Sequence, residues 1–159
     1  MTIIYEQSDN LVCSTHSCLI VTGASEAEIL EATNYEENRL GNVSFGGKRR
    51  KRSGKAFSFI TAPSIIRRLG FSSRSDWARG EEFGKPAHWF EGRYENALLY
   101  CCAPHLDKPH MSCIKGGQHF DNSLEHAKLK VSAIIEILGR GEDIYLHTSK
   151  NPMRVLDDK

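Results

Sequence analysis

A capping box followed by a helical stretch constrains the fold of this chain most directly. Ser25 and Glu28 stand three residues apart, the spacing at which two side chains cap the start of a helix reciprocally. The residues that follow predict a helix that begins at Glu26 and stops at Gly41, because glycine readily adopts the left-handed conformation that ends many helices.

A second capping pattern predicts another long helix nearer the C-terminus. Asn122, with Glu125 three residues later, suits a helix start, and Gly139 suits the end. The apolar positions between them recur at helical spacing: Leu124, Ala127, Val131, Ile134, Ile135 and Leu138. A short helix is also predicted over 63–69, with a proline at its start and a glycine after its end.

The other regular segments are predicted to be short strands bounded by turn residues. They are 1–6, 11–21, 42–45, 56–62, 86–90, 94–102, 110–115 and 142–148. Two long helices among such strands predict one α+β domain over residues 1–159, with an antiparallel or mixed sheet. Lobes at 1–62 and 86–150, followed by a tail at 151–159, would suit an internal pseudo-two-fold duplication.

The composition is that of a folded protein. The chain has 159 residues, 40% of them hydrophobic and 26% charged, which is enough for a buried core without disulfides or metal. No apolar run approaches the ~20 residues that span a bilayer, and no signal peptide is evident at the N-terminus. With five cysteines and no secretory signal, we expect reduced thiols, a cytoplasmic location and no membrane partner.

Two segments of the chain share a pattern. In 16–23 and in 110–117, a histidine stands seven residues before a glycine. A small polar side chain, Cys18 or Ser112, follows two residues after each histidine. Because residues i and i+2 of a strand share a face, each histidine is expected beside that side chain. If the two strands lie side by side, both pairs line one cleft.

These two segments resemble the signatures of the 2H phosphoesterase family. Residues 108–115 are similar to its Pro-His-x-Thr/Ser-apolar-x-Lys/Arg signature, and 16–23 to its His-x-Thr/Ser-Leu signature. The resemblance implies a bilobal α+β fold with internal two-fold symmetry. It also implies a metal-independent phosphoesterase, without cofactors, that acts on cyclic nucleotides or RNA-type phosphodiesters.

The resemblance also assigns roles to individual residues. His16 and His110 would be the catalytic acid and base, which suits the imidazole pKa of about 6.5. Cys18, Ser112 and Lys115 would bind the phosphate. Cysteine at position 18 departs from the Thr or Ser of the family, and its weak donor leaves the activity open. The alternative is that both histidines are structural, because His-x-Ser patterns are common.

A basic run provides an alternative function without catalysis. The segment from Lys48 to Lys55 gathers cations, among them Arg49, Arg50 and Arg52, between glycines at a predicted hairpin tip. Such a tip can grip a nucleic acid or another polyanion, or guide a nucleotide toward the histidines. A solvated hairpin tip is the simpler interpretation.

Two further arrangements involve the cysteines. Cys102, His105, His110 and Cys113 form a near-mirror pattern that could ligate zinc, although we expect no metal. A cysteine-protease-like site would pair Cys13 or Cys18 with a later histidine. No helix is predicted to begin at either cysteine, so we do not expect an activated thiolate there.

Overall fold

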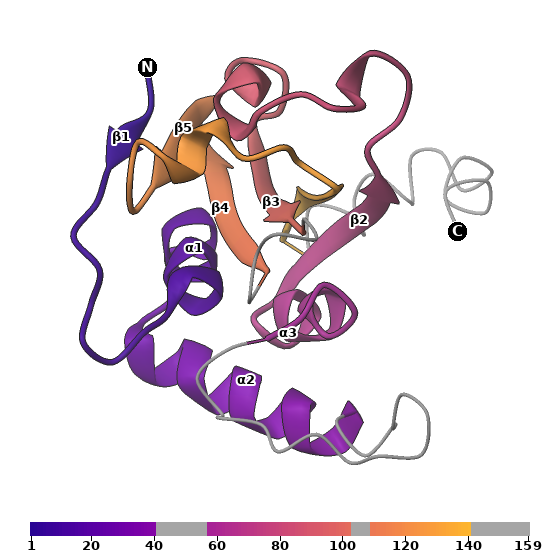
Figure 1. Ribbon diagram of the computed structural model, residues 1–159. Coiled ribbons are helices and arrows are strands. Elements are labelled where there is room, and N and C mark those ends of the chain that lie inside the picture. The colour runs from indigo at the N-terminus through magenta and orange to yellow at the C-terminus, as the bar shows by residue number, and fades with distance from the viewer. Residues whose placement is uncertain (41–56, 103–108, 141–159) are drawn as a thin grey trace, which may run out of the picture.

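The structure is a computed structural model that describes residues 1–40, 57–102 and 109–140 (Figure 1). The elements, in chain order, are β1 (Ile3–Ile4), α1 (Cys13–Thr22), α2 (Glu26–Leu40), α3 (Ala62–Arg68), β2 (Phe71–Trp77), the 3₁₀ helices η1 (Gly80–Glu82) and η2 (Ala87–Phe90), β3 (Asn96–Cys101), β4 (His110–Lys115), β5 (Gln118–Asp121), η3 (His126–Lys128) and β6 (Ala133–Arg140). The predicted α+β class is confirmed. None of the helices within these ranges is both long and apolar enough to cross a membrane.

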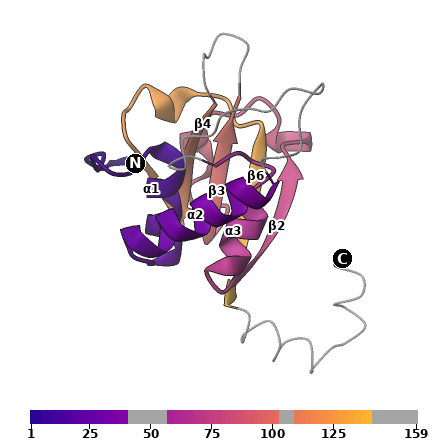
Figure 2. The same ribbon diagram turned by 90° about the horizontal axis from the view of Figure 1, so that it is seen from below.

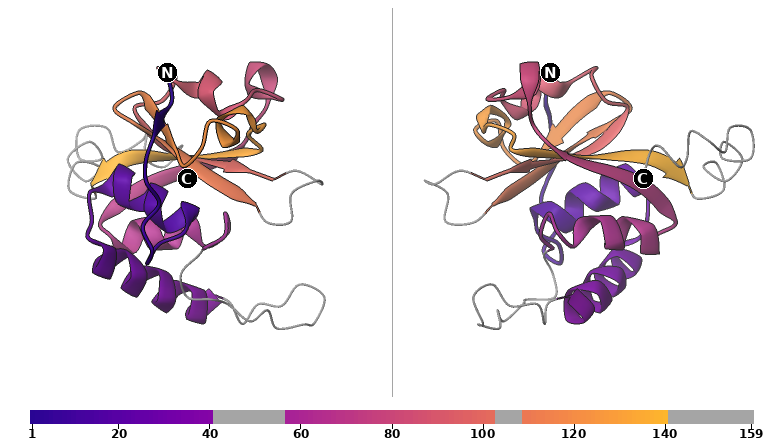
Figure 3. Two further views of the ribbon diagram at one scale, coloured as in Figure 1. Left: turned by 60° about the vertical axis from the view of Figure 1, so that its left-hand side comes forward. Right: turned by 90° about the vertical axis from the view of Figure 1, so that its right-hand side faces the viewer.

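One mixed sheet of six strands organises the described residues. Its order is β1-β5-β4-β3-β6-β2, and only the β1–β5 pair is parallel. The helices α1, α2 and α3 gather on one face of this sheet, while the 3₁₀ segments lie over the other face (Figures 2 and 3). The central strands are therefore covered on both sides.

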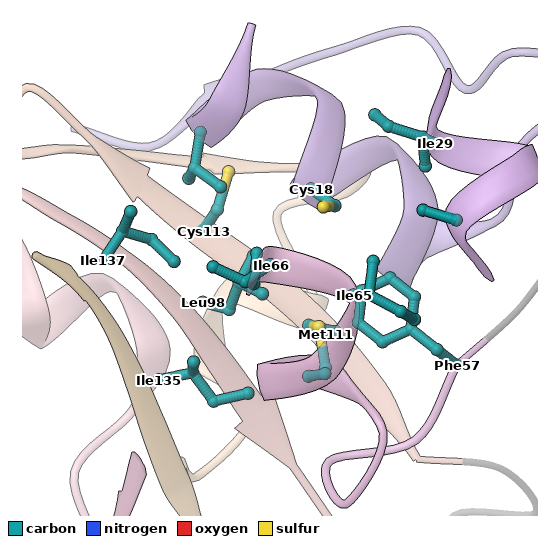
Figure 4. Close-up of a cluster of buried hydrophobic side chains, with 13 residues drawn as sticks. Cys18, Ile29, Phe57, Ile65, Ile66, Leu98, Met111, Cys113, Ile135 and Ile137 are labelled. Carbon is teal, nitrogen blue, oxygen red and sulfur yellow. The ribbon is translucent and has the colours of Figure 1, made fainter. Parts of the chain in front are cut away.

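The core is divided by the sheet into two clusters of apolar side chains. Neighbouring residues of β3 alternate between them, with Leu98 on the helix side and Leu99 on the other side. On the helix side, α1, α2 and α3 supply Cys18, Ile29 and Ile65, which pack with side chains from β4 and β6 (Figure 4). This packing fixes α1 against the middle of the sheet.

Two polar contacts attach α1 to β4. The hydroxyl of Ser17 donates to the Met111 carbonyl at 3.2 Å, next to the start of β4. At the other end, Lys115 Nζ donates to the Val21 carbonyl at 3.3 Å, where a cation complements the helix dipole. Residues four apart on a helix share a face, so Cys13 lies on the same side of α1 as Ser17. The N-terminus of α1 is thereby placed at the start of β4.

The strand predicted over 11–21 is wrong, because the chain forms α1 there. Val12 caps this helix without a side-chain acceptor, and the Thr15 hydroxyl instead accepts the Val12 N–H at 3.0 Å. The helix is covered by the sheet on one side and by α2 on another, so polar residues such as Thr15 and Ser17 are buried with the apolar ones. A helix buried on several sides has no amphipathic period to reveal it.

The helix predicted to begin at Asn122 is also wrong. The chain forms a loop with η3 and then β6, which pairs with β3 and β2 on its two edges. Ile134 packs on one face of the sheet, whereas Ile135 and Ile137 pack on the other. A strand buried on both faces is a continuous apolar run, and its spacing can imitate a helix.

The remaining predictions have mixed outcomes. The helix over 26–40 is confirmed as α2, and its capping box forms between Ser25 and Glu28, with the Glu28 N–H 3.2 Å from Ser25 Oγ. The strand over 110–115 is confirmed as β4, β3 lies within 94–102, and α3 overlaps 63–69. Residues 86–90 form η2 rather than a strand, and 57–61 form a turn. The strands predicted at 42–45 and 142–148, and the tail, lie outside the described residues.

Candidate active site

Cys13 is the first residue of α1 and is half-buried. The N–H groups in the first turn of a helix have no acceptor within that helix, so they carry partial positive charge. A thiol at this position is favoured as a thiolate. The expectation that no helix begins at Cys13 is therefore corrected.

A histidine and an aspartate come together on the β4–β5 hairpin. Gly116 and Gly117 form its tip with φ of 60° and 80°, a conformation that glycine adopts without strain. The register runs through Lys115 opposite Gln118, which brings Asp121 near the start of β4. There His110 Nε2 lies 2.7 Å from Asp121 Oδ1, and both side chains are buried. The carboxylate thus fixes the orientation of the imidazole.

His110 also interacts with the Cys13 thiol, and each of these two groups shifts the pKa of the other. Burial alone raises the pKa of Cys13, but His110 and the N–H groups of Met111 and Ser14 outweigh it and lower that pKa. Burial likewise disfavours the imidazolium, yet Asp121 and Cys13 together raise the pKa of His110 to about 9. Both shifts favour a thiolate–imidazolium pair.

The pKa values of the three buried cysteines shift in the opposite direction. Burial raises the pKa of Cys18 and of Cys101 to about 12, and it also raises the pKa of Cys113. None of these three thiols gains a histidine as a hydrogen-bond partner among the causes of its shift. Of these four cysteines, only Cys13, beside His110, has a lowered pKa.

Gln7 lies between the start of α1 and the end of β5. Its Nε2 donates to the Leu11 carbonyl at 2.7 Å and is 3.4 Å from His16 Nδ1, in the first turns of α1. Its Oε1 accepts from Asn122 Nδ2 at 3.5 Å. The backbone N–H of Asn122 in turn donates to Asp121 Oδ1 at 2.8 Å. Gln7 is thereby linked through Asn122 to Asp121, while its Nε2 group contacts Leu11 and His16.

A chain of hydrogen-bonded polar side chains lies beside Asp121. His119 Nδ1 is 2.8 Å from Thr2 Oγ1, and His119 Nε2 is 2.9 Å from Ser112 Oγ. Burial lowers the pKa of His119 to about 4, so this ring is neutral at neutral pH. Asp121 Oδ2 lies 3.7 Å from His119 Nε2 and makes no hydrogen bond within the described residues.

A further histidine covers the triad. The His126 ring lies with its centroid 4.0 Å from that of His110, and His126 Nδ1 is 2.5 Å from Asn122 Oδ1. Burial and the charge of His110 lower the pKa of His126. One ligand atom from each of His110, Asp121 and His126 can be chosen so that all lie within 4.8 Å of one another. These three residues could hold a metal ion.

The structure gives the residues predicted from the phosphoesterase resemblance helical, buried or structural positions. His16 lies on α1, where its ring stacks on Tyr5 with centroids 4.0 Å apart. Cys18 is fully buried in the core. Ser112 is also fully buried and is hydrogen-bonded to His119, so neither side chain is exposed for binding a ligand. Lys115 binds the end of α1. The assumption that His16 lies on a strand beside Cys18 is wrong.

The other predicted groups are also separated or not described. Of the proposed zinc ligands, Cys102 is exposed after β3, Cys113 is packed in the core, and His110 contacts Asp121. The fourth, His105, lies outside the described residues. The basic tip at 48–55, with Arg49, Arg50 and Arg52, also lies outside them, so polyanion binding stays a prediction.

One signal in the sequence could have indicated the triad. A Gly-Gly pair after a strand is typical of a two-residue hairpin loop, and folding 110–121 about Gly116 and Gly117 brings Asp121 back to the start of β4. No comparable sequence signal identifies Cys13 as the start of a helix. The helix α1, which begins there, has no side-chain N-cap and no acidic residue in its first turn.

Comparisons with protein-family models, with curated proteins and with solved structures find no match to this chain.

Proposed function

We propose that this protein is a cysteine-dependent acyl-transfer enzyme that cleaves an amide, ester or thioester bond. The observation that carries the proposal is a half-buried thiol at a helix N-terminus, which interacts with an imidazole that a buried carboxylate orients. Cysteine and serine hydrolases on unrelated folds use the same arrangement, in which a nucleophile contacts a base and the base contacts an orienting acid. Cys13 is the nucleophile, His110 the acid and base, and Asp121 the orienting group.

The reaction follows from these positions. The Cys13 thiolate attacks the carbonyl carbon of the substrate, and the electron pair of the C=O bond moves onto oxygen. When the tetrahedral intermediate collapses, the His110 imidazolium gives its proton to the leaving amine, alcohol or thiol, and a thioester to Cys13 remains. Neutral His110 then takes a proton from water, or from another molecule that receives the acyl group. That molecule attacks the thioester and releases Cys13.

The developing oxyanion needs hydrogen-bond donors beside Cys13. The backbone N–H of Cys13, at the start of α1, is one donor that the helix itself does not use. The Gln7 Nε2 group contacts the Leu11 carbonyl and His16 Nδ1 in the absence of substrate, and in our proposal one of its N–H groups turns to the oxyanion as the second donor. The same helix N-terminus therefore favours both the thiolate and the intermediate that forms from it.

A p-nitrophenyl acetate burst tests the proposal whatever the natural substrate is, because this activated ester acylates a reactive thiolate directly. We expect about one equivalent of p-nitrophenolate per protein, followed by a slower steady rate, as an acyl-enzyme accumulates. Intact mass and peptide mapping should place one acetyl group on Cys13. Panels of peptides, esters and thioesters then define the leaving group. Acetylation spread over lysines, with Cys13 unmodified, would contradict the proposal.

Substitutions of Asp121 should distinguish orientation from charge. In Asp121→Asn, the amide oxygen can still accept from His110, so we expect a loss in kcat/KM of no more than about tenfold. In Asp121→Ala, the imidazole loses its partner, and we expect a loss of about 10²- to 10³-fold. Steady-state kinetics measure both variants, with thermal unfolding as the check that each is folded. Equal rates in Asp121→Ala and the unmodified protein would exclude the orienting role.

Substitution of Gln7 should affect acyl transfer but not alkylation. In Gln7→Ala the oxyanion loses one donor, and we expect kcat to fall by about 10²-fold. Iodoacetamide reacts with the thiolate without forming an oxyanion, so its rate at Cys13 should stay the same. The exposed-surface variant Glu125→Ala serves as the control. A parallel loss of both reactions would show instead that Gln7 maintains the position of α1.

A further inference from the structure

We propose that His110, Asp121 and His126 form a zinc-binding site that switches the triad off. Zinc binding itself is independent of the proposed enzymatic function, whereas its inhibitory effect rests on that function. Two of the ligands belong to the triad, and the third, His126, has no part in the chemistry described above. A bound ion would occupy the groups that orient and exchange the proton.

The three side chains could bind a single ion if His126 moved slightly closer to His110 and Asp121. Their ligand atoms lie within 4.8 Å of one another, and the two imidazole rings are 4.0 Å apart between centroids. Zinc binds nitrogen and carboxylate oxygen at about 2.0 to 2.2 Å in a tetrahedron, which places ligand atoms roughly 3.4 Å apart. His126 must therefore approach by about an ångström, and it lies half-buried in the single turn of η3.

A second observation at this site is that Asp121 has a buried oxygen without a hydrogen-bond partner among the residues that the structure describes. Asp121 is completely buried, and its Oδ2 makes no hydrogen bond within the described residues. An unsatisfied carboxylate oxygen in the interior is costly, and a cation that reaches the carboxylate removes that cost. This observation is independent of the distances among the three side chains.

The neighbouring residue Asn122 prepares two of the ligands. Its Oδ1 is 2.5 Å from His126 Nδ1, which leaves His126 Nε2 as the free ligand atom. Its backbone N–H donates to Asp121 Oδ1 at 2.8 Å and orients the carboxylate. Such contacts behind the ligands are typical of metal sites, where they fix the ring orientation and the tautomer.

The donor set favours zinc over the hard cations. Two imidazoles and one carboxylate match catalytic zinc sites, whereas magnesium and calcium prefer six or more oxygen ligands. The fourth position can be taken by water. Zinc on His110 Nε2 takes the ring position that carries the second proton of the imidazolium, so the ring can no longer gain and give that proton as acid and base.

Calorimetric titration with zinc chloride tests the site on the Cys13→Ala protein. This background removes the nucleophilic thiol, so binding there cannot arise from the Cys13 sulfur or from turnover. We expect one equivalent of zinc, at least tenfold weaker binding in Cys13→Ala/His126→Phe, and no binding of magnesium. Phenylalanine keeps a ring against His110 but lacks the nitrogen. The matched control is Cys13→Ala/His88→Phe, which changes an exposed histidine of η2 and should bind zinc normally.

The second measurement is inhibition of the unmodified protein. Zinc should suppress the p-nitrophenyl acetate burst, EDTA should restore it, and His126→Phe should shift the inhibitory concentration at least tenfold upward. His126→Gln, checked by circular dichroism, replaces the phenylalanine variant if that variant does not fold. If Cys13→Ala protein binds no stoichiometric zinc, or if both His126 variants bind it as tightly as their parent, the site is disproved. Zinc binding without any burst would instead refute the proposed function alone.

Discussion

Replacement of Cys13 by alanine is expected to abolish acyl transfer. The thiolate at the start of α1 is the only group that forms the covalent intermediate in the proposed reaction. Removal of the nucleophile from a triad lowers kcat by roughly 10⁴- to 10⁶-fold. The p-nitrophenyl acetate burst should disappear, and no acetylated cysteine peptide should be found. The variant should remain folded, because Cys13 is half-buried rather than part of the fully buried core.

Two other variants make this result specific. Cys102→Ala removes an exposed cysteine at the end of β3 and should retain the full burst. Cys13→Ser keeps a nucleophile of similar shape, but its hydroxyl is not ionised by His110, so we expect a loss almost as large as in Cys13→Ala. A normal burst in Cys13→Ala would place the reactive group elsewhere and end the proposal.

Selective alkylation of Cys13 at low pH is the second large effect that we expect. At pH 6 an ordinary thiol is less than about 1% ionised, because its pKa is near 8.5. The pKa of Cys13 is lowered by His110 and by the N–H groups around it, so a larger fraction is thiolate at that pH. Iodoacetamide in EDTA buffer should therefore label Cys13 at least tenfold faster than Cys102, as measured by peptide mass spectrometry.

The histidine should account for this selectivity. In His110→Ala the thiol keeps the helix N-terminus but loses the imidazolium, so its alkylation at pH 6 should slow by at least about tenfold. His88→Ala, which changes an exposed histidine of η2, is the matched control. Equal labelling of Cys13 and Cys102 in the unmodified protein would show that no thiolate–imidazolium pair forms.

The parts of the fold that could be predicted are those with a local cause. The helix over 26–40 follows from a capping box between Ser25 and Glu28, and these side chains meet whatever the rest of the chain does. The β4 strand was also predictable, because glycines follow it directly. The structure of α1 and β6 depends on what covers them. Both are buried on more than one side, so tertiary packing overrides the periodicity of their sequences.

Of the candidate site, only His110 was predicted, as an acid or base with His16 as its partner, whereas a pairing of Cys13 with a histidine was considered and not expected. The position of Asp121 depends on the register of a hairpin, and that of Cys13 depends on where a buried helix begins. A pattern search weighs residues near one another in sequence, so it paired His110 with Ser112. In the fold, Ser112 is fully buried behind the triad, and it supports His119 instead. The chemistry therefore arises from contacts among distant segments, which composition and spacing do not encode.

The attachment of α1 to β4 has a consequence for biosynthesis. The thiol lies in the first helix of the chain, whereas the imidazole and the carboxylate lie on a hairpin that is translated much later. A nascent polypeptide that exposes only α1 and α2 to the cell therefore carries an ordinary cysteine with no partner to ionise it. In the proposed mechanism, Cys13 becomes a nucleophile only when β4 packs against α1, where Ser17 donates to the Met111 carbonyl. Fast alkylation of Cys13 at pH 6 can thus serve as a readout for complete folding, and truncation before β4 should leave Cys13 no more reactive than an ordinary thiol.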